Sequence, residues 1–154
     1  MNRLRQIGFA LANVALSLAL AGPVSAKDLD AVKFIYLAPV ISEEDVPAFQ
    51  AMLKSELVHE GFTVLPKPDK ADATMTVELI ITKKGDTYEV EAHAKLEEPD
   101  LNVLWTGSYK KSDKDRDKLI INAARQVSGK LKSAKTDVVT KKEEKNNKEA
   151  KQPR

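Results

Sequence analysis

The sequence predicts an α+β fold, a two-layer sandwich in which two helices cover one face of a mixed sheet of about five strands. Residues 32 to 133 follow the order strand, helix, strand, hairpin, strand, helix. The first strand–helix–strand unit implies parallel pairing through a right-handed crossover. The short turns between the later strands imply an antiparallel meander. Two helices can cover only one of the faces of such a sheet.

The first strand is expected over 32–39, where β-branched and aromatic residues lead to a proline. A helix should follow, because Ser42 and Asp45 approximate a capping box. Its apolar residues recur at helical spacing: Val46, Phe49, Leu53 and Leu57. Gly61 should end this helix in a left-handed conformation. A short strand over 62–65 completes the crossover unit.

Two alternating segments flank Lys84-Gly85-Asp86 and predict a β-hairpin. A second turn at 98–100 leads into a strand over 101–110. The last helix should begin at a cap formed by Ser112 or Asp113. Its apolar stripe comprises Leu119, Ala123, Ala124, Val127 and Leu131.

Alternation along the hairpin separates its side chains onto the two faces of the sheet. One face should be covered by the helices and carries Val77, Leu79, Ile81, Val90, Ala92 and Leu96. The uncovered face should carry Thr76, Glu78, Glu89, Glu91, His93 and Lys95.

The stretch from 87 to 96, TYEVEAHAKL, is the nearest approach to a chemical constellation in this chain. Glu91 and His93 are spaced so that they could share a metal ion, but a zinc site needs three protein ligands. Glu89 and Glu91 would need one desolvated partner to act as a catalytic pair. We therefore interpret these residues as the solvated side of a strand, and we expect no catalytic residue, no metal and no cofactor.

Trp105 shares strand parity with Val103 and Tyr109, which predicts that it lies in the core. Leu104 would then lie with Ile80 on the uncovered face and give that face apolar contact points. The alternative is that Trp105 is itself an exposed aromatic anchor. The predicted partner contacts are Ile80, Glu89, Glu91, His93 and Leu104.

The amino-terminal segment has the layout of a secretory signal over 1–26. Arg3 and Arg5 precede an apolar run, and small residues precede a predicted cut after Ala26; an uncleaved anchor is the alternative. No cysteine lies near this cut, so lipid attachment is not expected. These features predict a periplasmic or secreted protein with no stable membrane anchor after cleavage.

The composition predicts one domain over 27–134 and a disordered tail rich in Lys and Glu over 135–154. All acidic residues follow residue 26, so the mature chain would be formally neutral, which argues against nucleic-acid binding. The tail has a net charge of +3. It would serve either as a solubilising end or as a weak contact to anionic surfaces.

The order of elements resembles a group of bacterial envelope domains. The features that carry the resemblance are Gly61-Phe62-x-Val64 after a helix, Ala71-Asp72 before a strand, and a strand containing Val103 to Trp105. The group includes the amino-terminal domain of TolB-type proteins and the CsgG-type and LpoB-type lipoproteins. The resemblance implies a protein that binds other envelope proteins and performs no catalysis.

We therefore expect an exported accessory module that binds envelope proteins through its open sheet face or the neighbouring sheet edge. The alternative is a small periplasmic hydrolase or ligand-binding protein, for which Asp72 and Asp113 are the available polar residues. A third hypothesis is a protein that self-associates through sheet edges.

Overall fold

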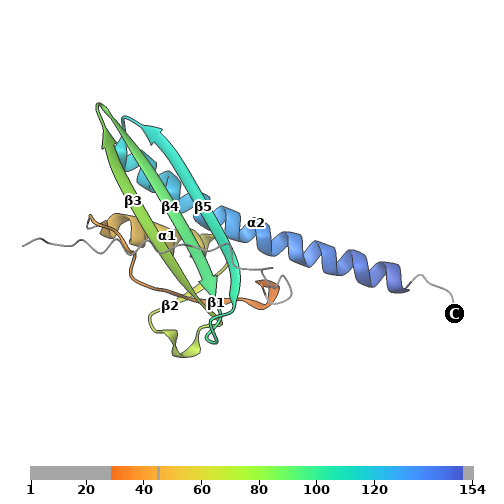
Figure 1. Ribbon diagram of the computed structural model, residues 1–154. Coiled ribbons are helices and arrows are strands. Elements are labelled where there is room, and N and C mark those ends of the chain that lie inside the picture. The colour runs from red at the N-terminus through yellow and green to blue at the C-terminus, as the bar shows by residue number, and fades with distance from the viewer. Residues whose placement is uncertain (1–28, 45, 151–154) are drawn as a thin grey trace, which may run out of the picture.

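The computed structural model describes residues 29–44 and 46–150 (Figure 1). The predicted signal segment lies outside the described residues. The elements in chain order are η1 (Leu29–Ala31), β1 (Phe34–Leu37), α1 (Pro47–His59), β2 (Thr63–Leu65), η2 (Pro68–Lys70), β3 (Ala73–Lys84), β4 (Thr87–Glu97), β5 (Val103–Asp113) and α2 (Arg116–Ala150).

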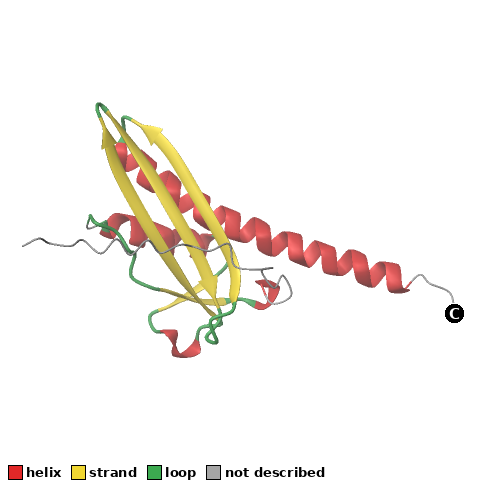
Figure 2. Cartoon of the chain, in the orientation of Figure 1, coloured by secondary structure: helices red, strands yellow, loops and turns green. Residues whose placement is uncertain are grey.

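The described strands form one mixed sheet in the order β2-β1-β3-β4-β5. β1 pairs in parallel with β2 and with β3, while the β3–β4 and β4–β5 pairs are antiparallel. Both α-helices lie on the same side of this sheet (Figures 1 and 2). The predicted α+β sandwich with a mixed sheet is confirmed.

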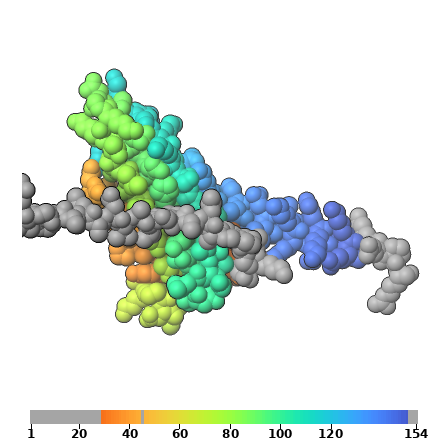
Figure 3. Space-filling model, viewed as in Figure 1, coloured from red at the N-terminus to blue at the C-terminus, as the bar shows by residue number. Residues whose placement is uncertain are grey.

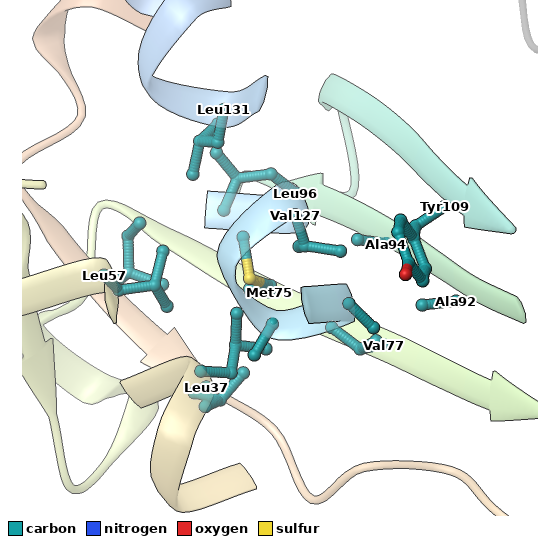
Figure 4. Packing of buried hydrophobic residues seen from close by; sticks show 14 of the residues in the cluster. Leu37, Leu57, Met75, Val77, Ala92, Ala94, Leu96, Tyr109, Val127 and Leu131 are labelled. Carbon is teal, nitrogen blue, oxygen red and sulfur yellow. The ribbon is translucent and has the colours of Figure 1, made fainter. Parts of the chain in front are cut away.

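The hydrophobic core lies between the sheet and the two helices. Figure 4 shows Leu57 from α1 and Leu131 from α2 directed toward Met75 and Leu96 on the strands. The fully buried side chains include Phe49, Ile35, Leu53, Leu57, Met75, Leu79, Leu96, Leu119 and Leu131. A chain without cysteine depends on this apolar burial, which contributes about 25 cal/mol per Å² removed from water.

The β3–β4 hairpin has the register that alternation predicted. Leu79 pairs with Ala92, and Lys84 pairs with Thr87 across the turn. Gly85 adopts a φ of 61°, which favours glycine in this tight turn. The inward positions from Ala73 to Leu79 and from Val90 to Leu96 are buried, and Ile81 is partly buried against the core. The outward positions are partly or largely exposed, so the predicted assignment of faces is confirmed for this hairpin.

The start of α1 differs from the prediction. The helix begins at Pro47, with Val46 at its N-cap and no side-chain cap, so Ser42 does not cap it. Ile41 still pairs with Glu78 as an extended residue, and this pairing holds the chain on the sheet past the expected cap. Pro47 can begin a helix because the first helical positions have no internal partner for their N–H groups.

The end of α1 agrees with the prediction. Gly61 has a φ of 93°, and its N–H donates to the carbonyl of Val58 at 3.0 Å. The N–H of Phe62 donates to the carbonyl of Leu57 at 3.0 Å. This pair of bonds is the Schellman arrangement, in which a left-handed glycine satisfies the last helical carbonyls.

The tail predicted to be disordered from residue 135 is helical as far as residue 150, because α2 continues without a break (Figure 1). The ammonium of Lys135 lies 5.0 Å from the centre of the Phe62 ring, and Lys142 Nζ lies 2.6 Å from Asp30 Oδ2. Lys, Glu and Ala are good helix formers, and extension of an existing helix needs no new nucleus. The prediction considered composition and missed this continuity.

Candidate binding surface

The face of the sheet opposite the helices is a candidate binding surface, which we call the open face. Its members alternate with the buried residues of each strand. They are Phe34 and Tyr36 on β1, Thr74, Thr76, Glu78 and Ile80 on β3, Glu89, Glu91, His93, Lys95 and Glu97 on β4, and Thr106, Ser108 and Lys110 on β5.

A ladder of ion pairs crosses the open face between the hairpin and β5. Glu91 accepts from two sides, with His93 Nε2 at 2.8 Å from Oε1 and Lys110 Nζ at 3.0 Å from Oε2. Glu89 lies 2.9 Å from Lys84 Nζ and 3.5 Å from Lys110 Nζ. Glu89, Glu91 and His93 are therefore brought together as the sequence predicted, on adjacent same-face positions of β4.

The ladder holds its carboxylates in the ionised form. The hydrogen bond from Lys84 lowers the pKa of Glu89, and the hydrogen bond from Lys110 lowers the pKa of Glu91. The same contacts with Glu91 and Glu89 raise the pKa of Lys110. A general acid needs a carboxyl whose pKa is raised by desolvation, so these groups are shifted in the direction that disfavours acid catalysis.

Acidification is expected to weaken the ladder. A lowered folded-state pKa contributes stability that is fully present above the ordinary glutamate value of about 4.3 and is lost as the pH falls through the folded value. Glu91→Gln should therefore destabilise the protein at pH 7 by about 1 kcal/mol or less, because the pairs are partly exposed. Urea unfolding of the unchanged protein and of Glu91→Gln at pH 7 and pH 3 measures this difference in stability, which should be smaller at pH 3. A stability difference between the two proteins that stays constant over this range would contradict the assignment.

Leu104 does not lie on the open face, and its predicted role as a partner contact is wrong. Leu104 is only 1% exposed and Trp105 only 7%, and both belong to the hydrophobic core. Leu96 pairs with Trp105 but Glu97 pairs with Val103, so Leu104 is an extra residue in a β-bulge. A bulge interrupts alternation, which allows two consecutive side chains to be buried.

Two aromatic residues of the open face were missed in the list of predicted contacts. Phe34 is 42% exposed, and Tyr36 lies two residues further along β1 on the same face. Their outward direction follows from the burial of Ile35 and Leu37. Alternation in 34–37 could have identified them, as it identified the hairpin contacts.

The polar residues available to an enzyme are engaged in backbone hydrogen bonds. Asp72 Oδ2 accepts the N–H groups of Lys33 and Phe34, each at 2.8 Å. Asp113 Oδ1 accepts the N–H of Asp115 at 3.2 Å, and such backbone bonds lower the pKa of Asp113. Within the described residues, no group of three or more His, Cys, Asp or Glu side chains is placed to hold a metal ion.

The comparisons with known proteins show a common fold. No protein family and no curated protein matches the chain. The PelC dodecamer from Paraburkholderia phytofirmans is similar with a TM-score of 0.52 and 12% identity, over 73% of this chain and 94% of that chain. A minor lipoprotein from Acinetobacter baumannii matches with a TM-score of 0.45 and 12% identity, over 66% and 92%. A ribosomal subunit interface protein from Coxiella burnetii matches with a TM-score of 0.36 and 13% identity, over 67% and 98%.

At these identities the similarity shows the fold alone. Bacterial lipoproteins are among the structural neighbours, and the finer likeness to the TolB, CsgG and LpoB group stays a prediction. No helix within 29–44 or 46–150 is long and apolar enough to cross a membrane. The chain is therefore an α+β domain that shares its fold with the PelC dodecamer subunit.

Proposed function

We propose that this chain is a non-catalytic binding module of the bacterial envelope that docks another protein on its open face. The observation that carries the proposal is the asymmetry of the sheet. Both helices lie on one side of the sheet. The other side presents the ladder of ion pairs together with the exposed apolar side chains of Phe34 and Ile80. Apolar points within a polar surface are typical of protein contact sites.

The chemistry of the ladder supports binding in preference to catalysis. Glu91 has both carboxylate oxygens occupied, by His93 and by Lys110. Charges fixed in this way can select a partner with the complementary pattern and reject others, because a mismatch leaves like charges opposed. The secretory layout of the first 26 residues supports an envelope location.

Capture of partners from a periplasmic extract tests the proposal. The variant Glu91→Ala/His93→Ala should reduce the amount of the captured protein by about fivefold to tenfold, which corresponds to about 1 kcal/mol or somewhat more at a contact site. The matched control is His59→Ala/Glu60→Ala, which removes the same two residue types at the end of α1. Equal capture by all three proteins would contradict the role of the open face.

Self-association can be distinguished from binding of a different protein by a measurement on the same purified chain. The similar PelC protein is a dodecamer, and a mass measurement of this chain in solution reports whether it also assembles. A homo-oligomer that is lost in Glu91→Ala/His93→Ala would make a second copy the partner of the open face.

A further inference from the structure

Strand β3 extends beyond its parallel neighbour. β1 ends with Leu37 paired to Met75, and one further bridge joins Ile41 to Glu78. β3 continues to Lys84, and the hairpin projects past the segment that precedes α1 (Figures 1 and 3). In the part of the chain that the structure describes, no strand pairs with this side of β3 after Glu78.

The backbone groups on this edge have a known direction. The N–H of Leu79 donates to the carbonyl of Ile41 at 2.8 Å, so residue 79 directs its backbone groups away from β4. Because direction alternates along a strand, the N–H and C=O groups of Ile81 and Lys83 point to the same side. They form a row of donors and acceptors of the kind that an added strand completes.

The other edges of the sheet are protected. On β5, Lys130 from α2 donates to the carbonyl of Ser108, which places a cation on that edge. β2 is only three residues long and is followed by Pro66. Short strands, prolines and lysines all oppose pairing with a further strand. The edge of β3 after Glu78 lacks these protections until the lysines at the turn.

A groove lies beside this edge, with a cavity of about 390 Å³. One wall is the segment 41–44, and the other is 78–82 of β3. Ile41 is 53% exposed and Ile80 is 41% exposed, so both offer apolar contact. The size is within the range of ordinary ligand sites, about 300 to 1,000 Å³.

All the charged side chains that line the groove are acidic. Its lining contains Glu43, Glu44 and Glu78 and no Lys, Arg or His. Glu44 is bonded to Arg116, and no ion pair joins the described residues to Glu43 or Glu78. The lysines at the hairpin turn interact elsewhere, Lys84 with Glu89. An occupant with positive side chains would therefore be attracted to this groove.

We propose that the groove binds an extended peptide segment with alternating basic and apolar side chains, which adds as a strand to β3 over 79–83. The segment takes the place in the sheet that the chain itself leaves after Ile41. Its backbone pairs with Ile81 and Lys83, and its basic side chains face Glu43 and Glu78. The inference rests on the proposed function as a protein-binding module and specifies a second contact at the border of the open face, with which it shares Glu78 and Ile80.

A labelled peptide of alternating lysine and valine tests this, with alternating glutamate and valine as the control. Fluorescence anisotropy with the intact chain should show binding of the lysine peptide at least about tenfold tighter than the glutamate peptide, and the difference should shrink in high salt. Methylation of the peptide nitrogens should abolish binding, because it removes the strand donors.

Variants of the protein locate the contact. Glu43→Lys/Glu78→Lys should weaken binding of the lysine peptide by at least about tenfold. Lys83→Pro should weaken it as well, since proline is tolerated at edge positions but removes the outward N–H. Asp69→Lys, in η2 and outside the lining of the groove, should leave peptide affinity unchanged.

The results separate the two proposals. Absence of lysine-peptide binding, or equal binding of both peptides, would overturn the groove assignment even if envelope capture depends on Glu91 and His93. Binding that survives Glu43→Lys/Glu78→Lys would also overturn it. Peptide binding as described, with capture unaffected by changes at Glu91 and His93, would overturn the open-face proposal and leave the groove in place.

Discussion

Replacement of Gly107 by alanine is expected to lower the free energy of unfolding by about 1–3 kcal/mol, the usual cost of overpacking a filled core. A Cβ at this position would lie 2.4 Å from Cζ2 and 2.4 Å from Cη2 of Trp105, far inside van der Waals contact. The indole lies over Gly107 on the same face of β5, and Trp105 is only 7% exposed. The ring must shift to accommodate even a methyl group.

Urea unfolding monitored by circular dichroism measures this effect in every variant, including the Trp105→Leu background, which lacks the only tryptophan in the chain. Gly129→Ala is the matched control, since a Cβ at residue 129 meets nothing within 4 Å and the residue lies inside α2. It should stabilise the protein by about 0.5–1 kcal/mol. In a Trp105→Leu background, Gly107→Ala should cost much less. An equal cost in both backgrounds would show that the indole is not the obstacle.

Alternation and turn chemistry were sufficient to predict the β3–β4 hairpin. Each outward position between Thr76 and Lys95 could be assigned because one face is buried, and a slip of one residue would reverse every side chain. Gly85 at the turn and Gly61 after α1 have positive φ values, so their positions also follow from local chemistry. These features depend on neighbours in sequence.

The errors arose where distant contacts decide the outcome. Leu104 is buried because a bulge opposite Leu96 and Glu97 interrupts the alternation. The residue types in 101–110 do not predict a bulge. Ser42 is no helix cap because Ile41 pairs with Glu78, a contact between separate segments. The helical extension of α2 depends partly on Lys135 reaching Phe62. The groove beside β3 likewise forms from two segments that are far apart in sequence.

The covered and open faces of the sheet can be compared through two consecutive residues of β3. Leu79 is 1% exposed on the helix side, whereas Ile80 is 41% exposed on the open face. Leu79→Ala should lower the free energy of unfolding by about 2–5 kcal/mol, because it removes buried contacts and leaves a cavity. Ile80→Ala should cost about 1 kcal/mol or less, as at other surface positions.

This pair of variants tests most directly whether only one face of the sheet is buried in the core. Both remove aliphatic side chains of equal size from neighbouring positions. The higher strand propensity of isoleucine would add to the cost of Ile80→Ala, so it acts against the predicted order and cannot produce it. The account predicts unfolding free energies that differ by at least about 2 kcal/mol between Leu79→Ala and Ile80→Ala, with the lower value for Leu79→Ala. Equal losses of stability would mean that both faces are packed in the folded chain, and the open face could not be a free binding surface.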